Sequence, residues 1–516
     1  MKIKLFILYA FLPFLVNAQN FKTTRIGEPD YDFNNANGLY ISGGVSAIST
    51  GNGYMGISVE SKRKMNLTFR LNKIHYSVTL FRYDKAYNLI KKNEISTDEN
   101  EMGPIEPRLV LIHHLVYLIY YNQSDSGINV NIASINETDL GIQNVKKLLS
   151  LSLKNITAGR FSDFFSYYDL KIETSPDGNH LLFMFHSGIN NDLYYASTDS
   201  RFNVLKTAME KMEDYGDIRV NNVFVENDGS FYGSFFHKKH STRHQCLFAC
   251  TPGAPFKSVA VEENENLHYR QTFLVNGKQK DQLQFCGTTV NGDGNITGAI
   301  YQTLNKADFK VLDEMRSGIP QELLDRCDKD KYGWVNKKSA AIYGSFEFIL
   351  NQTNNGSIVL AGTLKRFGSR LGRNNDFITL VITGPILVLV FAEKNIVFRR
   401  IPKVEEGGSQ AFFPFAYKDK VILFYQDNEE NLKTDMEKDK IVDCGKCVQY
   451  LIAAKVSSDG TISRSIVGTE KEPHALFNTN AEIIDESSFT FRFNDLKFRG
   501  GYYAYKDINY LMEIKD

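Results

Sequence analysis

The chain has 516 residues, with 60 basic and 60 acidic side chains and a formal net charge of zero. This balance argues against a nucleic-acid-binding protein, because such proteins concentrate lysine and arginine for phosphate contacts. Tyrosine and phenylalanine are plentiful, at 27 and 37 residues, whereas there is one tryptophan. Aromatic and β-branched residues favour strands, so the composition predicts a β-rich chain.

The first eighteen residues have the pattern of a cleaved secretory leader. Two lysines precede an apolar run over residues 5–16, and Val16 and Ala18 occupy the −3 and −1 positions of a cleavage site. The apolar run, of about 12 residues, is shorter than the roughly 20 that a membrane-spanning helix needs. We therefore expect residues 1–18 to be removed, the mature chain to be periplasmic or extracellular, and no transmembrane segment to remain.

A hairpin of two apolar strands around a polar turn recurs along the chain. Its turns carry Asp-Gly, Asn-Gly or Lys-Asp, which tolerate positive φ or hydrogen-bond their own backbone. A second hairpin follows most copies, so the pair forms a four-stranded unit that recurs at intervals of roughly 50–75 residues. The first hairpin lies at residues 107–121, 171–186, 221–236, 270–287, 349–363, 413–426 and 481–494, and the second at 76–93, 128–147, 192–206, 245–261, 298–312 and 449–466.

A four-stranded sheet repeated around an axis is the blade of a β-propeller. We predict an all-β protein with a single propeller domain over residues 39–516 and about seven blades, with six or eight as the other counts. Strings of β-sandwiches and β-solenoids are the rival architectures. We expect a loose lead-in at 19–38 and a loop excursion with a short helix near 316–338. Strands near 39–60 and 510–514 are expected to complete a shared blade.

Few other segments interrupt this pattern. Helical periodicity is best over residues 142–151, 203–215 and 321–327. An apolar stretch at 378–392 is broken by a Gly-Pro pair, and its β-branched residues favour a buried hairpin over a membrane span.

Several segments of the C-terminal part follow one another in a characteristic order: Asn351–Thr363, Asn375–Thr383, Arg399–Lys403, Val421–Asn431 and Leu451–Ser463. In this order, from Asn351 to Val467, they resemble secreted β-propeller-like proteins of Gram-negative bacteria. The turn from Ser175 to Gly178 also resembles that of the TolB-type propeller repeat. The resemblance implies a fold and a compartment, but no activity.

An even number of cysteines in an exported chain predicts disulfides. Cys246 and Cys250, if they share a strand, would lie about 13 Å apart and could not pair with each other. Cys444 and Cys447 lie in a polar loop and could close a small ring; a redox-active pair is the alternative, although no helix start is predicted beside them. The disulfide candidates are Cys246, Cys250, Cys286, Cys327, Cys444 and Cys447.

Three groups of side chains are candidate metal ligands. A histidine-rich loop has zinc-ligating side chains, although adjacent lysines favour a solvated basic loop. Two further loops place oxygen ligands at alternate positions, as structural calcium prefers, but neither has a glutamate at the twelfth position, so ordinary turns are the alternative. The candidates are His237, His240 and His244 for zinc, and Asn291, Asp293, Asn295, Asp328 and Asp330 for calcium. No other cofactor is expected.

No motif for a named reaction is present, neither a nucleophile elbow, a zinc-protease helix nor a phosphate-binding glycine loop. We therefore expect an exported, non-catalytic propeller that binds a protein or glycan partner through a site built on the fold. The alternative is a polysaccharide hydrolase or lyase acting at the channel mouth. The enzyme would need two carboxylates, with a histidine and a tyrosine, converging there. A binding site would be aromatic and free of convergent ionisable groups.

Overall fold

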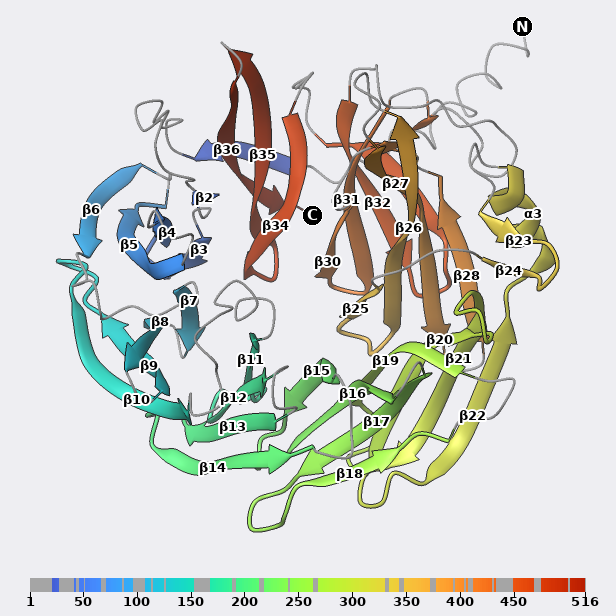
Figure 1. Ribbon diagram of the computed structural model, residues 1–516, viewed down its shortest axis with the longest axis horizontal. Helices are drawn as coiled ribbons and strands as arrows, with labels where there is room; N and C mark the ends of the chain where they lie inside the picture. Colours follow the sequence, from blue (N-terminus) through green and yellow to red (C-terminus); the bar gives the residue numbers. More distant parts are fainter. Residues whose placement is uncertain are drawn as a thin grey trace, which may run out of the picture.

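The structure is a computed structural model of the chain (Figure 1). It describes residues 21–26, 41–42, 46–50, 52–65, 71–85, 88–95, 107–112, 115–124, 127–152, 168–187, 192–212, 218–239, 242–262, 268–329, 334–342, 348–371, 377–392, 395–402, 405–406, 412–428, 431–432, 449–467, 475–499 and 502–515.

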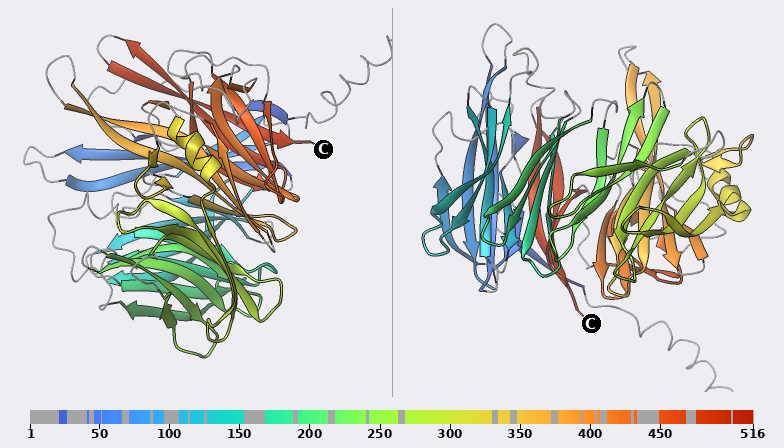
Figure 2. Two further views of the ribbon diagram at one scale, coloured as in Figure 1. Left: turned by 90° about the vertical axis from the view of Figure 1, so that its right-hand side faces the viewer. Right: turned by 90° about the horizontal axis from the view of Figure 1, so that it is seen from below.

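In the described part of the chain, the strands form eight antiparallel sheets around a central axis (Figure 1). Each sheet is built on four main strands, and in the second to seventh sheets along the chain the first strand lies nearest the axis (Figure 1). Figure 2 shows the strands running through the thickness of the ring. The protein is therefore an eight-bladed β-propeller, which confirms the predicted class and corrects the expected seven blades to eight.

The first four blades follow the chain in order. Blade 1 contains β2 (Ile41–Ser42), β3 (Ser46–Ser49), β4 (Tyr54–Met65), β5 (Leu71–Tyr83) and β6 (Leu89–Ile95). Blade 2 contains β7 (Arg108–Ile112), β8 (Leu115–Ser124), β9 (Gly127–Ile135) and β10 (Ile142–Ser152). Blade 3 contains β11 (Tyr168–Thr174), β12 (His180–Ser187), β13 (Asp192–Asp199) and β14 (Val204–Lys211). Blade 4 contains β15 (Ile218–Val225), β16 (Phe231–Lys239), β17 (Thr242–Cys250) and β18 (Lys257–Ala260).

The remaining blades carry small additions. Blade 5 contains β19 (His268–Asn276), β20 (Gln282–Val290), β21 (Ile296–Asn305), β22 (Val311–Gly318), β23 (Val335–Asn336) and β24 (Ala341–Ile342). Blade 6 contains β25 (Phe348–Gln352), β26 (Ile358–Leu371), β27 (Phe377–Ala392), β28 (Asn395–Ile401) and β29 (Glu405–Glu406). Blade 7 contains β30 (Phe413–Tyr417), β31 (Lys420–Asn428), β32 (Gln449–Ser457) and β33 (Ile462–Ile466). Blade 8 contains β34 (Ala475–Asp485), β35 (Ser488–Arg499), β36 (Tyr502–Ile514) and β1 (Phe21–Ile26).

The core consists of apolar clusters between successive blades. Strand β12 shows why: Leu181 and Phe183 pack toward blade 2, whereas Leu182 and Met184 pack toward blade 4. Successive side chains of a strand point to opposite faces, so a strand buried on both faces is continuously apolar. The described residues form such a cluster at each of the eight interfaces, including the one between blades 8 and 1. The ring is therefore closed.

The N-terminal strand closes the ring by completing the last blade. Strand β1 pairs with β36 in antiparallel register, with Phe21 opposite Ile514. The expected loose lead-in at 19–38 thus contains the outermost strand of blade 8. The strands expected near 39–60 belong to blade 1 instead of a shared blade, and this difference accounts for the eighth blade.

Two of the three expected helices are outer strands. Most of residues 142–151 lies in β10, and most of 203–215 lies in β14. An outermost strand has one face toward solvent, and β10 also contains two register shifts against β9. Such bulges interrupt the period of two, so the apolar pattern imitates helical spacing. The third helix is confirmed as α3 (Gln321–Lys329), and no described helix has the length and apolar character to cross a bilayer.

The apolar stretch at 378–392 is one strand, β27, and not a hairpin. At a bulge in this strand, Gly384 and Pro385 together lie opposite a single residue of β26. That residue lies between Thr363 and Lys365, which both pair with residues of β27. Proline is tolerated at bulges because no ladder hydrogen bond is needed there. A Cβ atom on Gly384 would lie 2.5 Å from the ring of Trp334, so the glycine permits close packing.

Candidate functional site

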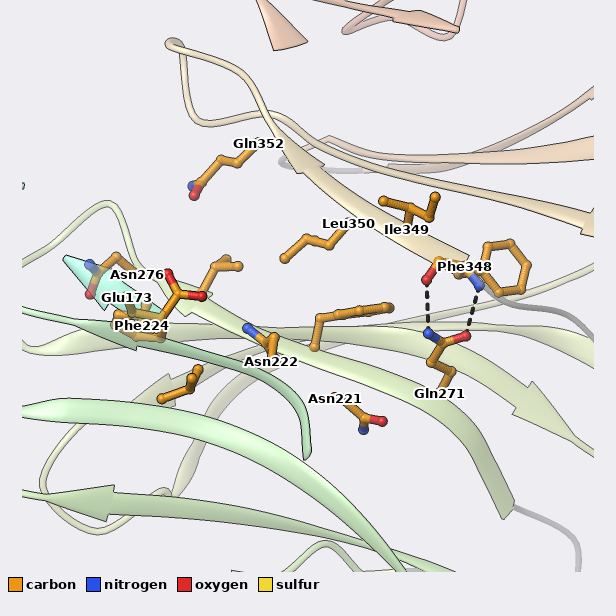
Figure 3. A pocket seen from close by; sticks show the side chains of 13 residues that line it. Glu173, Asn221, Asn222, Phe224, Gln271, Asn276, Phe348, Ile349, Leu350 and Gln352 are labelled. Carbon is orange, nitrogen blue, oxygen red and sulfur yellow. Dashed lines mark hydrogen bonds between the residues drawn. The ribbon is translucent and has the colours of Figure 1, made fainter. Parts of the chain in front are cut away.

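The innermost strands of blades 3 to 6 surround a cavity of about 480 Å³ beside the central axis (Figure 3). Strands β11, β15, β19 and β25 supply its walls. Seven of the described lining residues are apolar, five carry side-chain amides and one is a carboxylic acid. They are Glu173, Asn221, Asn222, Val223, Phe224, Gln271, Phe273, Val275, Asn276, Phe348, Ile349, Leu350 and Gln352.

Two of the amides join neighbouring blades. The Asn222 side chain accepts a hydrogen bond from Leu274 N at 3.0 Å and donates one to Leu274 O at 2.5 Å. Gln271 does the same one blade further on, accepting from Phe348 N and donating to Phe348 O, both at 2.8 Å (Figure 3). Each amide thus takes the place of a neighbouring backbone at the inner edge of the next blade. We call each such pair of hydrogen bonds, between one side-chain amide and one backbone residue of the next blade, an amide clasp. Since an unpaired backbone group is costly to bury, these clasps stabilise the cavity wall.

Behind Asn222, a network of hydrogen-bonded polar side chains continues between blades 4 and 5. The Ser234 hydroxyl, which has one proton to donate, lies within hydrogen-bond distance of Asn222 Oδ1 at 3.0 Å and Thr272 O at 2.9 Å. Gln245 Oε1 accepts from Thr272 Oγ1 at 2.8 Å and from Asn221 Nδ2 at 3.1 Å. Buried polar groups that are fully bonded hold their elements in one arrangement. The wall of the cavity is therefore fixed by hydrogen bonds as well as by apolar packing.

Glu173 is the ionisable residue among the described residues that line the cavity. It lies near the end of β11 and its carboxyl group is directed into the cavity (Figure 3). Burial raises the pKa of Glu173 to about 7, and the positive charge of Lys171 opposes that effect. A carboxyl group of this kind exists in both protonation states near neutral pH, so it can either donate or accept a hydrogen bond.

Asn276 and Gln352 complete the polar part of the lining. The Oδ1 atom of Asn276 is buried and has no hydrogen-bond partner. Gln352 is exposed at the end of β25, with its amide directed toward the cavity (Figure 3). The apolar walls of Phe224, Val275 and neighbouring side chains adjoin these groups. The cavity therefore suits a ligand that combines an apolar surface with hydrogen-bonding groups.

The predicted metal ligands that the structure describes lie outside this lining. His237 and His244 face each other across β16 and β17, with ring centroids 5.3 Å apart, while His240 lies outside the described residues. Throughout the described ranges, no group of three or more histidine, cysteine, aspartate or glutamate side chains could hold a metal ion. Cross-strand pairing thus brings together two of the three predicted histidines.

In each of the two predicted calcium loops, one predicted ligand makes a protein contact through a side-chain oxygen. Asn291 Oδ1 accepts hydrogen bonds from the backbone N–H groups of Asp293 and Asn295, at 3.1 Å and 3.0 Å, which closes a tight turn. Asp328 forms an ion pair with Lys337 at 2.7 Å, and Asp330 lies outside the described residues.

The structure shows no disulfide at the four described cysteines, all of which are buried: Cys246, Cys250, Cys286 and Cys327. Each packs into an apolar cluster between blades, where a cysteine behaves as a small hydrophobic residue. Cys246 and Cys250 do share strand β17 and do not pair, as their spacing predicts. Cys444 and Cys447 lie outside the described residues.

The cavity residues were not predicted from the sequence, although one signal was present. Asn221 and Asn222 interrupt the otherwise apolar strand VNNVFV, and buried polar residues in an apolar strand indicate a structural or functional role. Glu173 has no comparable local signal, because KIETSPDG reads as an ordinary strand and turn.

Comparisons with known proteins add little beyond this geometry. No family model matches the chain, and no curated protein sequence is similar to it. Among solved structures, the Dos1 propeller is 11% identical, with a TM-score of 0.41, over 96% of this chain and 95% of that one. The polysaccharide lyase Uly1 is 10% identical, with a TM-score of 0.39, over 92% and 89%. TolB from Acinetobacter baumannii is 10% identical, with a TM-score of 0.27, over 81% of each chain. At these scores, the assignment of the fold depends on the strand pairing and not on the likeness.

Proposed function

We propose that the protein is an exported, non-catalytic β-propeller that binds a protein or glycan partner in the cavity lined by β11, β15, β19 and β25. The composition of that cavity carries the proposal: apolar and amide side chains surround a single carboxyl group. Ligand sites typically combine apolar walls with a few convergent polar groups, and the volume of about 480 Å³ lies in their usual range.

The rival function is cleavage of a polysaccharide. Glu173 favours it, because a carboxyl group whose pKa is about 7 is suited to general acid or base catalysis. Glycoside hydrolysis generally uses two carboxyl groups that flank the scissile bond. The described lining supplies one, without a histidine or tyrosine beside it. The binding function is therefore the better supported of the two.

A blocking substitution tests the binding site. Gln352 is an exposed lining residue, so Gln352→Trp should fill part of the cavity without disturbing the core. Gln279→Trp places the same residue on the exposed β19–β20 turn and serves as the matched control. The mature protein and both variants would be applied to a glycan array and to a displayed peptide library.

We expect hits for the unmodified protein and for Gln279→Trp, and at least a tenfold loss for Gln352→Trp, about 1.4 kcal/mol. Equal binding by the two variants would place the partner site elsewhere and refute the proposal. Turnover of a polysaccharide that disappears in Glu173→Gln would establish the enzymatic rival instead.

A further inference from the structure

A lysine amine and a cysteine thiol meet where blade 3 contacts blade 4. Lys206 lies on β14, the outermost strand of blade 3, and Cys250 is the last residue of β17 in blade 4. Lys206 Nζ lies 3.1 Å from Cys250 Sγ. The same nitrogen donates a hydrogen bond to Ala254 O at 2.9 Å, so its position above the thiol is fixed from two sides.

The aromatic ring of Tyr195 forms the floor of this site. Lys206 Nζ lies 5.6 Å from the ring centroid, and the Tyr195 hydroxyl lies 3.5 Å from Cys250 Sγ. The hydroxyl also lies 3.3 Å from Glu210 Oε1. Burial raises the pKa of Tyr195, which keeps the phenol protonated. The sulfur therefore has a nitrogen nucleophile on one side and a hydrogen-bonding hydroxyl on the other.

This thiol is buried, with 3% of the residue exposed, but it lies next to an exposed turn. Cys250 directly precedes the turn formed by Thr251, Pro252 and Gly253, in which Pro252 and Gly253 are exposed. Lys206 itself is half-buried. Cys286, by comparison, is fully buried in the core between blades 5 and 6, and burial alone raises the pKa of its thiol. An exposed turn thus lies beside Cys250, whereas the neighbours of Cys286 in β20 are buried.

We propose that Lys206 and Cys250 form an oxidative cross-linking site, in which a hydroperoxide converts the pair into a covalent sulfenamide. The sulfur attacks the hydroperoxide, forming an S–O bond as the O–O bond breaks. The second oxygen leaves with the thiol proton as water or an alcohol, and a sulfenic acid remains. The Lys206 ammonium group releases a proton to water, and the resulting amine attacks this sulfur. The S–O bond breaks, an S–N bond forms, and the oxygen leaves as water with a proton from nitrogen.

Each step balances, because the hydroperoxide takes the two electrons that the sulfur loses. Sulfenic acids are known to condense with nitrogen in this way, and condensation protects the sulfur from irreversible oxidation. The product would tie the outer strand of blade 3 to blade 4 and would be opened by an added thiol. The inference depends on the contact between these blades and is independent of the ligand in the central cavity.

Treatment of the full-length protein with hydrogen peroxide tests this site. We expect the intact mass to fall by that of two hydrogen atoms, because one oxidation and one condensation remove one hydrogen from each group. Trypsin, which needs a free lysine side chain, should no longer cleave after Lys206. The digest should instead contain a peptide joining Lys206 to Cys250, and dithiothreitol should restore both the mass and the cleavage.

Lys206→Arg is the matched variant, because it keeps the positive charge but replaces the nucleophilic amine. Dimedone, which traps sulfenic acids, should then label Cys250 in the variant at least tenfold more than in the unmodified protein. Cys246→Ala, on the same strand, should leave the cross-link unchanged. Direct oxidation of Cys250 to a sulfinic acid, a disulfide between cysteines, or continued cleavage after Lys206 in the treated, unmodified protein would each overturn the proposal. These three outcomes are measured on the unmodified protein, so the proposal can be refuted even if Lys206→Arg fails to fold.

Discussion

Replacing Asn222 with alanine should weaken the joint between blades 4 and 5. The substitution removes the hydrogen bonds to Leu274 N and Leu274 O and the bond from Ser234. Leu274 is 0% exposed, so its backbone groups depend on the Asn222 amide and not on solvent in the intact protein. A buried polar group without a partner costs about 1–3 kcal/mol. Because Ser234 keeps its bond to Thr272, two backbone groups are left, and the free energy of unfolding should fall by about 2–6 kcal/mol.

The single tryptophan provides the assay. Trp334 is 0% exposed in the core between blades 5 and 6, so its fluorescence reports the loss of packing next to the altered joint. Urea unfolding would be followed by this fluorescence and by far-ultraviolet circular dichroism, which reports all eight blades. Agreement of the two midpoints is needed before a single free energy is assigned.

Asn179→Ala is the control, because Asn179 donates to Asp177 Oδ2 at 2.9 Å on an exposed turn. Its loss should change the free energy of unfolding by no more than about 0.5 kcal/mol. If Asn222→Ala also remained within about 0.5 kcal/mol of the unmodified protein, the amide clasp would contribute nothing and the reasoning would be refuted.

Three further predictions concern pH, packing and closure. Glu173 has a native pKa of about 7 against an ordinary value of 4.5, so the unfolded chain releases this proton first and stability falls as pH rises between those values. Glu173→Gln should remove that fall and raise the unfolding free energy above pH 7 by about 1–3 kcal/mol; identical pH profiles would contradict this. Gly384→Ala should cost about 1–3 kcal/mol by forcing a methyl group against the indole ring, whereas Gly292→Ala, with nothing within 4 Å, should be neutral in the same urea assay. Phe21→Ala should cost about 1–3 kcal/mol because this side chain packs on the blade 7 and 8 cluster, whereas Lys22→Ala, whose side chain is 56% exposed, should cost under about 1 kcal/mol; a reversed order would argue against closure by β1.

Much of the propeller is predictable because its information is local. The turn at Ser175 illustrates this: Gly178 has a positive φ of 71°, and Ser175 accepts and donates the backbone bonds that close the turn. Hairpins of this kind need no distant partner to be recognised, so their positions follow from the sequence. The run from Leu181 to Met184 likewise reveals a strand buried on both faces.

The number of blades is harder to predict, because it depends on pairings between the two ends of the chain. Strand β1 has six residues and lies in a polar stretch, and its partner β36 ends two residues before the C-terminus. Nothing in either segment specifies the other. The same limit applies to Cys250 and Lys206, whose contact follows from blade packing and not from their spacing of 44 residues.

The clasps also decide which polar groups remain for a ligand. Composition alone suggests a cavity rich in amides, yet Asn222 and Gln271 direct both ends of their amides to the backbone of the next blade. Asn221 donates its Nδ2 hydrogen bond to Gln245, so a ligand in this cavity would meet chiefly Glu173, Asn276 and Gln352, which lie toward one side (Figure 3). This asymmetry favours a partner that inserts an apolar group with a single polar end. It disfavours a long polysaccharide, which would need polar contacts along the whole cavity. A peptide side chain or a terminal sugar therefore fits the described lining better than the interior of a polymer.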